Sequence, residues 1–277
     1  MKKTITLLAV VALSLGAAEK LPLPSGKAEF AQDKPARAGK VETFMPRIEG
    51  NAIVCGNKRL DLRNDSGMTL SCDGEVMGRF FYYFTGDDKA TKKQYWIECG
   101  RWFADKEKSS FRKEGNTFFA DTFMKIGDYP SWEACKQQVE LLPDGLIKID
   151  IQWMPPEDQN LALKGHSLFF MMPYKTGGGK SITLNGSKTM LPMEAVAGSI
   201  CGEYRPKEFK IVFLPDDPGK TFTITAVKPD IDLFNSWAFK DGLRFNFLDN
   251  KKTRHLTVFL DIRQGVKKSN HGYGGGD

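Results

Sequence analysis

The middle of the chain carries the clearest alternation of apolar and polar residues. Between positions 147 and 153 apolar side chains occupy every second position, and polar side chains occupy the positions between them. In residues 138–141, Val139 and Leu141 alternate with Gln138 and Glu140, and Pro143-Asp144-Gly145 separates the two runs. A period of two is typical of a strand with one buried and one wet face. Asp-Gly supplies the positive φ that a tight turn requires, so the sequence predicts a β-hairpin here.

Similar short runs follow one another along most of the chain, separated by Asp-Gly and Asn-Gly turns. The predicted strands are 52–55, 59–63, 68–72, 75–84, 94–103, 110–113, 117–124, 135–141, 147–153, 161–163, 167–172, 181–184, 188–191, 208–214, 221–227, 237–239, 243–248 and 254–262. No segment has a sustained apolar period of 3.6 residues. The pattern predicts an all-β fold, a large antiparallel two-sheet β-sandwich over residues 49–264. Two smaller sandwiches, divided near residues 177–179, are the alternative.

The two ends of the chain differ from this pattern. Residues 1–18 have the features of a secretory signal peptide, with Lys2 and Lys3 before an apolar stretch and Gly16-Ala17-Ala18 as the cleavage site. The apolar stretch is too short to cross a hydrocarbon core of roughly 30 Å. We therefore expect a secreted or periplasmic protein with no membrane insertion after cleavage. Residues 19–48 contain four prolines and predict an extended arm or linker, and residues 265–277 predict a flexible tail.

Composition and charge narrow the class of partner. The chain has 277 residues, of which 41% are hydrophobic and 27% charged, as in a folded soluble protein. Its net charge of +6 becomes +4 when Lys2 and Lys3 leave with the signal peptide. This small excess is spread along the chain without a basic cluster, so we predict no nucleic-acid partner.

The cysteines leave two possibilities open. Cys55, Cys72, Cys99, Cys135 and Cys201 are odd in number, so at least one thiol is free. None has the spacing of a metal site, and each lies in or beside a predicted strand, where a thiol packs as a small apolar group. We expect mostly free, buried cysteines and no metal. The alternative is one or two disulfides, with Cys55–Cys72 as the favoured pair because one hairpin would bring them together.

One stretch resembles a known fold family. The run Gln138-Val139-Glu140-Leu141-Leu142-Pro143-Asp144-Gly145-Leu146-Ile147-Lys148-Ile149, a break at Pro155-Pro156, and Pro173 before a glycine-rich loop are similar to the strand pattern of galactose-mutarotase-like supersandwich domains. Such domains recur in aldose epimerases and as non-catalytic parts of secreted bacterial glycosidases and polysaccharide lyases. The resemblance covers about a quarter of the chain and consists of turns and alternation, so it bears on the fold more than on the activity. It implies a sugar ligand.

No catalytic motif accompanies that resemblance. Aldose epimerases of this fold use a His acid and a Glu base, whereas nothing in the sequence fixes Glu194 or Glu203 opposite His166, His255 or His271. The chain also lacks a Gly-x-Ser-x-Gly elbow, a His-Glu-x-x-His motif, a phosphate-binding glycine loop and a calcium loop. We therefore predict no catalytic residue and no cofactor.

Aromatic residues are the candidate binding groups. Residues 80–84 are all aromatic, so both faces of that strand carry rings. Either another element covers the outer rings, which is the favoured interpretation, or those rings are exposed and stack on sugars. Trp132 follows the turn-rich segment 127–131, which makes it a candidate surface ring. The candidate carbohydrate-binding residues are Trp132, Tyr129, Trp96, Trp102, Arg101 and Asp128.

These observations predict a secreted bacterial β-sandwich protein that binds a poly- or oligosaccharide, or assists glycan processing, without catalysis. A glycan-active enzyme (a glycoside hydrolase, a lyase or an aldose-epimerase-like protein) is one alternative, and a structural envelope protein is another. The absence of an acid/base motif favours the binding protein, whereas turnover of any sugar would establish the enzyme.

Overall fold

A computed structural model describes residues 44–99, 104–126, 129–154, 161–205, 207–227, 231–249 and 254–265. These residues belong to one compact unit, which covers 42–277. The predicted signal peptide (1–18), residues 19–43 of the predicted arm and residues 266–277 of the predicted tail lie outside the described residues. So do three of the candidate site residues, Arg101, Trp102 and Asp128.

The first of two sheets, sheet A, contains nine strands joined in antiparallel pairs. Their order is β1, β2, β3, β4, β5, β11, β17, β16, and β6 pairs with the end of β5 that β4 does not reach. The strands are β1 (Arg47–Glu49), β2 (Ala52–Cys55), β3 (Lys58–Leu62), β4 (Met68–Cys72), β5 (Glu75–Asp88), β6 (Gln94–Cys99), β11 (Leu161–Met172), β16 (Ile231–Phe239) and β17 (Gly242–Asp249).

Sheet B also has nine strands, in the order β13, β12, β14, β15, β18, β10, β9, β8, β7. They are β7 (Ser110–Glu114), β8 (Thr117–Met124), β9 (Trp132–Leu141), β10 (Ile147–Trp153), β12 (Ser181–Leu184), β13 (Ser187–Met190), β14 (Glu208–Phe213), β15 (Phe222–Val227) and β18 (His255–Asp261). The single helix in the described part of the chain, α1 (Tyr174–Gly177), is four residues long. No helix there is long and apolar enough to cross a membrane.

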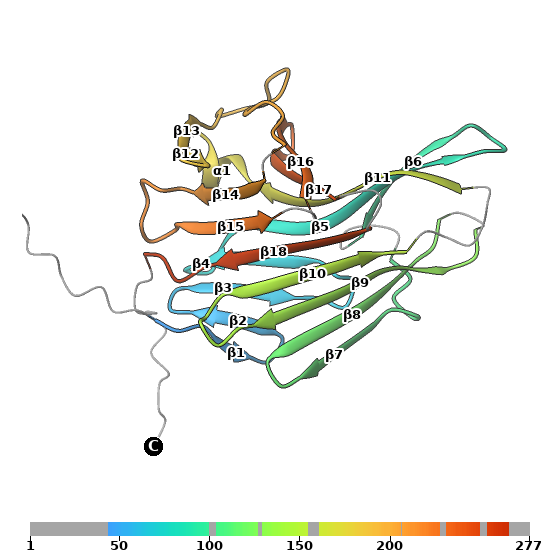
Figure 1. The fold of residues 1–277 in the computed structure, drawn as a ribbon, viewed down its shortest axis with the longest axis horizontal. Helices are drawn as coiled ribbons and strands as arrows, with labels where there is room; N and C mark the ends of the chain where they lie inside the picture. The colour runs from blue at the N-terminus through green and yellow to red at the C-terminus, as the bar shows by residue number, and fades with distance from the viewer. Residues whose placement is uncertain are drawn as a thin grey trace, which may run out of the picture. The chain divides into compact units, whose positions relative to one another are not determined.

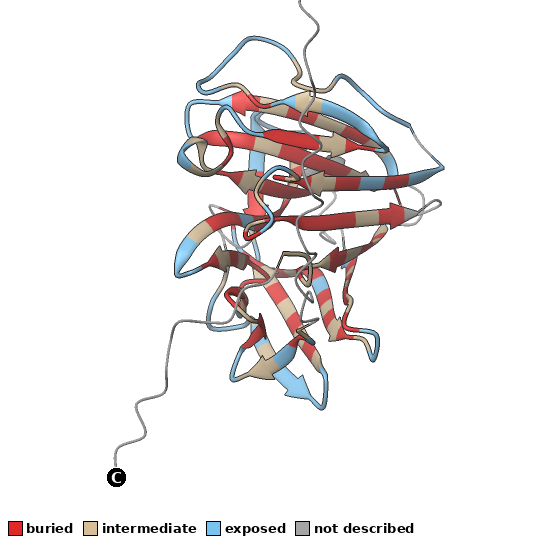
Figure 2. Cartoon of the chain, turned by 90° about the vertical axis from the view of Figure 1, so that its left-hand side faces the viewer, coloured by how far each residue is buried: buried red, intermediate tan, exposed pale blue. Residues whose placement is uncertain are grey.

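The two sheets pack on one another as a single sandwich (Figure 1). Each sheet combines strands from before and after residues 177–179, so the alternative of two separate sandwiches is wrong. The all-β, antiparallel two-sheet prediction is confirmed. Buried residues alternate with intermediate or exposed ones along many strands, such as β8 and β18 (Figure 2), because successive side chains of a strand point to opposite sides of its sheet.

Aromatic side chains from both sheets meet in the core. The ring centroid of Tyr82 in β5 is 5.1 Å from that of Trp153 in β10, with the rings edge to face. The rings of Phe170 in β11 and Phe213 in β14 are also 5.1 Å apart. Gln137 of β9 donates a hydrogen bond of 2.5 Å from Nε2 to the hydroxyl of Tyr82. Ring contacts of this geometry add to the stabilisation from burial, so they hold the two sheets in register.

Several predicted boundaries were wrong for one physical reason. Residues 85–88, which resemble an acidic turn, instead continue β5, because β6 and β11 pair with both of its edges. Strand β1 begins inside the predicted arm, ends one residue beyond it, and pairs with β2. Strand β16 begins at Ile231 rather than at position 237, and β11 is one strand with a bulge between Leu163 and Gly165. In each case pairing with a neighbour outweighs the local turn propensity.

The described cysteines confirm the expectation of free thiols. Cys55, Cys72 and Cys135 are buried, Cys201 is partly buried, and all four are free. The proposed Cys55–Cys72 disulfide is wrong, because Lys58 of β3 pairs with Cys55 on one side and with Cys72 on the other. Two strand spacings, about 9 to 10 Å, separate the two cysteines, whereas a disulfide requires Cα atoms within about 7 Å.

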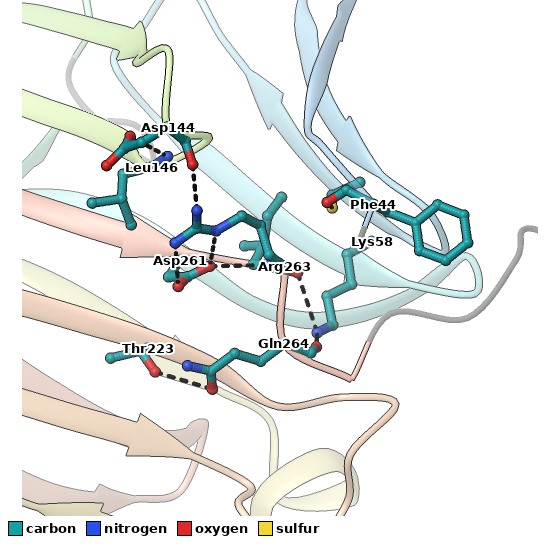
Figure 3. A network of polar contacts seen from close by, with 10 residues as sticks. Phe44, Lys58, Asp144, Leu146, Thr223, Asp261, Arg263 and Gln264 are labelled. Atoms are coloured by element: carbon teal, nitrogen blue, oxygen red, sulfur yellow. Dashed lines mark hydrogen bonds and ion pairs between the residues drawn. The ribbon is translucent and has the colours of Figure 1, made fainter. Parts of the chain in front are cut away.

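Lys58 itself joins the two sheets through a polar network (Figure 3). Its side chain is fully buried, and Nζ donates hydrogen bonds to the backbone carbonyls of Thr221, Ile262 and Gln264. Those carbonyls lie just before β15 and just after β18, whereas Lys58 belongs to sheet A. The lysine therefore attaches the end of the last strand to the opposite sheet.

Candidate functional site

The outer side of sheet A, which points away from sheet B, carries aromatic side chains. In β5 the rings of Phe80, Tyr82 and Phe84 belong to the core between the sheets. Phe81 and Tyr83 alternate with them and therefore lie on the opposite side of the sheet. The consecutive aromatic residues thus supply rings to both sides of this strand.

Four rings form a surface that we call the aromatic face: Phe81 and Tyr83 of β5, Trp96 of β6 and Phe169 of β11. The centroid of the Tyr83 ring is 5.3 Å from that of Trp96 and 4.8 Å from that of Phe169. The rings of Phe81 and Phe169 are 6.1 Å apart and meet edge to face. These separations are typical of interacting aromatic pairs, so the rings form one continuous apolar surface across three strands.

Exposure decreases across the aromatic face. The residue Trp96 is 61% exposed, Tyr83 is half-buried, and Phe169 and Phe81 are buried. Trp96 lies on β6, which pairs only with β5 in the described part of the sheet. A large apolar side chain left this exposed is informative, because burial would stabilise it. The sheet edge therefore offers an open indole ring that is continuous with a buried aromatic floor.

Arg244 of β17 reaches over this floor. Its guanidinium carbon lies 5.8 Å from the ring centroid of Phe169 and 4.7 Å from that of Phe239. Its Nη2 donates a hydrogen bond of 2.8 Å to Asp241, and its Nη1 lies 3.9 Å from Oε1 of Glu98. Because β5 and β11 separate β17 from β6, the ion pair with Glu98 crosses the aromatic face.

The hydroxyl of Tyr83 is a neutral hydrogen-bonding group. Burial raises the pKa of Tyr83 above its ordinary value of 10.0, and the nearby carboxylate of Glu98 raises this pKa further. The phenol therefore keeps its proton over the whole physiological pH range. It is able both to donate and to accept a hydrogen bond beside the rings.

Two buried polar atoms beside the aromatic face have no hydrogen-bond partner among the described residues. They are Oδ1 of Asn246 and Nε of Arg244. The amide nitrogen of Asn246 donates to Oδ1 of Asn235 at 2.5 Å, and Nε1 of Trp237 donates to the same oxygen at 3.2 Å. A buried polar atom without a partner costs about 1–3 kcal/mol. Asn246 and Arg244 are therefore polar side chains beside the aromatic face whose hydrogen-bonding capacity is not filled among the described residues.

A cavity of about 220 Å³ adjoins the aromatic face at Phe81. We call it the arginine pocket, and its lining includes Arg63, Thr69, Arg79, Phe81 and Met171. Thr69, Arg79 and Met171 lie side by side on β4, β5 and β11, as the strand register shows. The pocket and the rings therefore share one side of sheet A.

The structure brings few of the predicted site residues together. Trp96 lies on the aromatic face, as described above. Tyr129 is half-buried, packs against the core, and donates a hydrogen bond of 2.7 Å to Oδ2 of Asp88. Trp132 is only 9% exposed, and its ring lies 6.3 Å from that of Phe84 inside the sandwich. The expectation of a surface ring at Trp132 is therefore wrong, because β9 begins at this residue and pairs it with Met124 of β8.

Sequence reasoning missed four residues at this site, Phe169, Glu98, Arg244 and Asn246. A signal for two of them was present, since polar residues at 244 and 246 alternate with Leu243, Phe245 and Phe247. That alternation predicts a polar outer side for β17. It does not tell which strands lie beside β17, so it does not connect Arg244 with Glu98.

A second cavity, of about 340 Å³, lies on the outer side of sheet B. Its lining includes Lys210, Thr223, Thr225, Phe259 and Asp261. Both carboxylate oxygens of Asp261 accept hydrogen bonds of 2.9 Å from Arg263, and the hydroxyl of Thr223 lies 3.3 Å from Oε1 of Gln264 (Figure 3). This cavity has one ring, and its Asp261, Thr223 and Gln264 side chains already have partners, so it is less suited to stacking a ligand than the aromatic face.

The two described histidines, His166 and His255, lie away from the aromatic face. His166 is buried between the sheets, where its ring stacks on Trp153 at 5.8 Å. His255 contacts Asp150 on the outer side of sheet B. The described residues contain no group of three or more His, Cys, Asp and Glu side chains that would hold a metal ion.

Comparison with known proteins gives little guidance. No protein-family model matches the chain, and no curated protein sequence matches it either. Among solved structures the chain is similar to the α-N-acetylgalactosaminidase NagBb from Bifidobacterium bifidum in complex with GalNAc, with a TM-score of 0.46 and 8% sequence identity. The similarity covers 76% of this chain and 36% of that protein, so the chain spans about a third of its length.

Proposed function

We propose that this protein binds a poly- or oligosaccharide on the aromatic face and leaves it chemically unchanged. The observation that carries the proposal is the exposed ring of Trp96, which continues into Tyr83 and Phe169. Sugar rings combine an apolar C–H side with a rim of hydroxyl groups. An aromatic surface with a few fixed polar groups at its border matches both features.

The polar groups at the border suit orientation of a ligand rather than catalysis. Glycoside hydrolysis requires a general acid and a second carboxylate about 5 to 10 Å away. The carboxylates of Glu98 and Asp241 instead both contact Arg244. A carboxylate held by a guanidinium serves as a fixed hydrogen-bond acceptor. We therefore favour binding over turnover, and a glycan-active enzyme is the alternative.

The proposed location is outside the cytoplasm. Residues 1–18 have the charged, apolar and small-residue regions of a secretory signal peptide. A protein exported in this way would meet extracellular or envelope glycans. The proposed partner and the proposed location are thus consistent with each other.

Replacement of the exposed indole tests the proposal. A sugar ring that covers about 60 Å² of Trp96 would gain about 1.5 kcal/mol at about 25 cal/mol per Å², which corresponds to roughly a tenfold change in Kd. We expect the mature chain to bind one or more glycans of a plant, algal and mucin panel with a Kd between about 1 μM and 1 mM. Calorimetry should show that Trp96→Ala weakens this binding about tenfold and that Trp96→Phe weakens it less.

The matched control is Tyr204→Ala, which removes a ring that is 38% exposed and lies outside the aromatic face. This variant should bind as the unmodified protein does. An equal loss of glycan affinity in Trp96→Ala and Tyr204→Ala would refute the proposal. The proposal would also be refuted if the folded protein bound no glycan of the panel. A reducing-end assay on the same samples should find no new chain ends, and their appearance would establish the enzyme instead.

A further inference from the structure

One cation beside the aromatic face, Arg79, has no counter-charge in the described part of the chain. Arg79 is exposed on β5, and its guanidinium has no hydrogen bond or ion pair with any described residue. The side chains on either side of it in the sheet are Thr69 and Met171, which carry no charge. Five N–H donors are therefore open at the arginine pocket.

The neighbouring charges do not neutralise Arg79. Arg63, the second arginine of the pocket, is paired with Asp65. The other oxygen of Asp65 accepts a hydrogen bond of 3.1 Å from the backbone N–H of Gly67, so both of its oxygens are occupied. Arg244 lies one strand beyond Met171 and is paired with Glu98 and Asp241. Of the two arginines that line the pocket, Arg79 is thus the one without a carboxylate partner among the described residues.

The pocket is of a size for one ring or end group. Its volume of about 220 Å³ is below the range of about 300–1,000 Å³ that is usual for a whole small-molecule ligand. Its lining includes Phe81, which belongs to the aromatic face. Along β5, Arg79 lies about 7 Å from Phe81 and about 13 Å from Tyr83. A ligand of a few sugar rings would therefore reach both the pocket and the stacking rings.

From these observations we infer that the glycan is acidic, and that Arg79 binds an anionic group on it, a carboxylate or a sulfate ester. This inference rests on the proposed function, because the anionic group must belong to a sugar chain that lies on the aromatic face. A guanidinium presents paired N–H groups that match the oxygens of either anion. The hydroxyl of Thr69 supplies a further donor at the wall of the pocket.

The experiment compares three oligosaccharides of equal length by calorimetry on the mature chain: a neutral one, a uronate-containing one and a sulfated one. We expect at least one of the acidic ligands to bind about tenfold more tightly than the neutral one in 50 mM NaCl. Arg79→Gln should remove that advantage, so that acidic and neutral ligands bind this variant with similar affinity. The advantage should also shrink in 500 mM NaCl, because salt screens an exposed ion pair. Comparison of the affinities for the uronate-containing and the sulfated oligosaccharide shows which anion the pocket prefers.

Lys113→Gln is the control, since it removes the same charge from an exposed position on β7 of sheet B. It should leave the preference for acidic ligands intact. Equal affinity of the protein for neutral and acidic ligands would overturn the inference, and so would an equal loss of affinity for both kinds of ligand in Arg79→Gln. In either case, glycan binding that Trp96→Ala weakens would still support the proposed function. Glycan binding that Trp96→Ala does not weaken would instead overturn the proposed function itself.

Discussion

Replacement of Lys58 by methionine changes how stability depends on pH. The Nζ of Lys58 is enclosed between the sheets and donates to three backbone carbonyls. Burial lowers the pKa of Lys58 from 10.5 to about 8, because the interior disfavours the charged amine. Methionine has a similar length and no charge, so Lys58→Met removes this titration from the folded state.

The sign of the effect follows from proton binding. Between pH 8 and 10.5 the unfolded chain keeps the lysine proton and the folded chain has lost it, so the free energy of unfolding rises with pH in this window. The gap of about 2.5 pH units, at about 1.36 kcal/mol each, gives about 3 kcal/mol. Lys58 therefore destabilises the fold most below pH 8 and least above pH 10.5.

Titration of the buried Cys72 thiol changes the free energy of unfolding with pH in the opposite direction. Burial raises the pKa of Cys72 from 9.0 to about 11. Its contribution to stability is complete below pH 9 and is lost as the pH rises towards 11, because the unfolded chain then loses the proton first. The protein itself should therefore gain stability mainly between pH 8 and 9. The same thiol is present in Lys58→Met, so comparison of the two proteins at each pH reports the titration of Lys58 together with its charge interaction with Cys72.

Urea unfolding of both proteins at intervals from pH 7 to 10.5 measures this difference. The stability of the protein relative to Lys58→Met should increase by about 3 kcal/mol from pH 8 to 10.5. Lys210→Met, which removes an exposed lysine of β14, should show no such increase. A difference that stays constant with pH would refute the interpretation of Lys58 as a buried, titrating amine.

Two further predictions concern the core. Trp132→Ala should lower the free energy of unfolding by about 3–5 kcal/mol, as expected for removal of a buried tryptophan. Glycan binding by the folded variant should be unchanged. Loss of binding without loss of stability would contradict the core position of this ring. Thiol titration of the denatured, unreduced protein should detect at least four free cysteines, Cys55, Cys72, Cys135 and Cys201 among them, and a smaller number would contradict the free thiols described above.

The fold was predictable because its signals are local. The hairpin of β9 and β10 is specified by alternating residues and the Asp144-Gly145 turn, and the structure pairs Leu141 with Ile147 across that turn. Segments with mixed signals were less predictable. Residues 85–88 carry the glycine and aspartates of a turn, yet they remain in β5 because strands on both sides offer backbone hydrogen bonds.

The candidate site was less predictable because it depends on strand order. The run of aromatic residues in β5 indicated rings on both sides of that strand, and Trp96, one of the candidate binding residues, is exposed in the structure. Phe169 and Arg244 are remote from β5 in sequence and join the site only because β11 and β17 lie next to it in sheet A. Trp132 follows a turn-rich segment, so local composition suggested a surface position that pairing with β8 excludes.

The most direct test of the central claim is a crystal structure of the mature chain soaked with the tightest-binding oligosaccharide of the panel. Sugar rings should lie flat on Trp96 and Tyr83, with hydroxyl groups within hydrogen-bond distance of Arg244 or Asn246. An acidic ligand should also place its anionic group in the arginine pocket beside Arg79. Ligand density in the cavity of sheet B, with the aromatic face empty, would contradict the account.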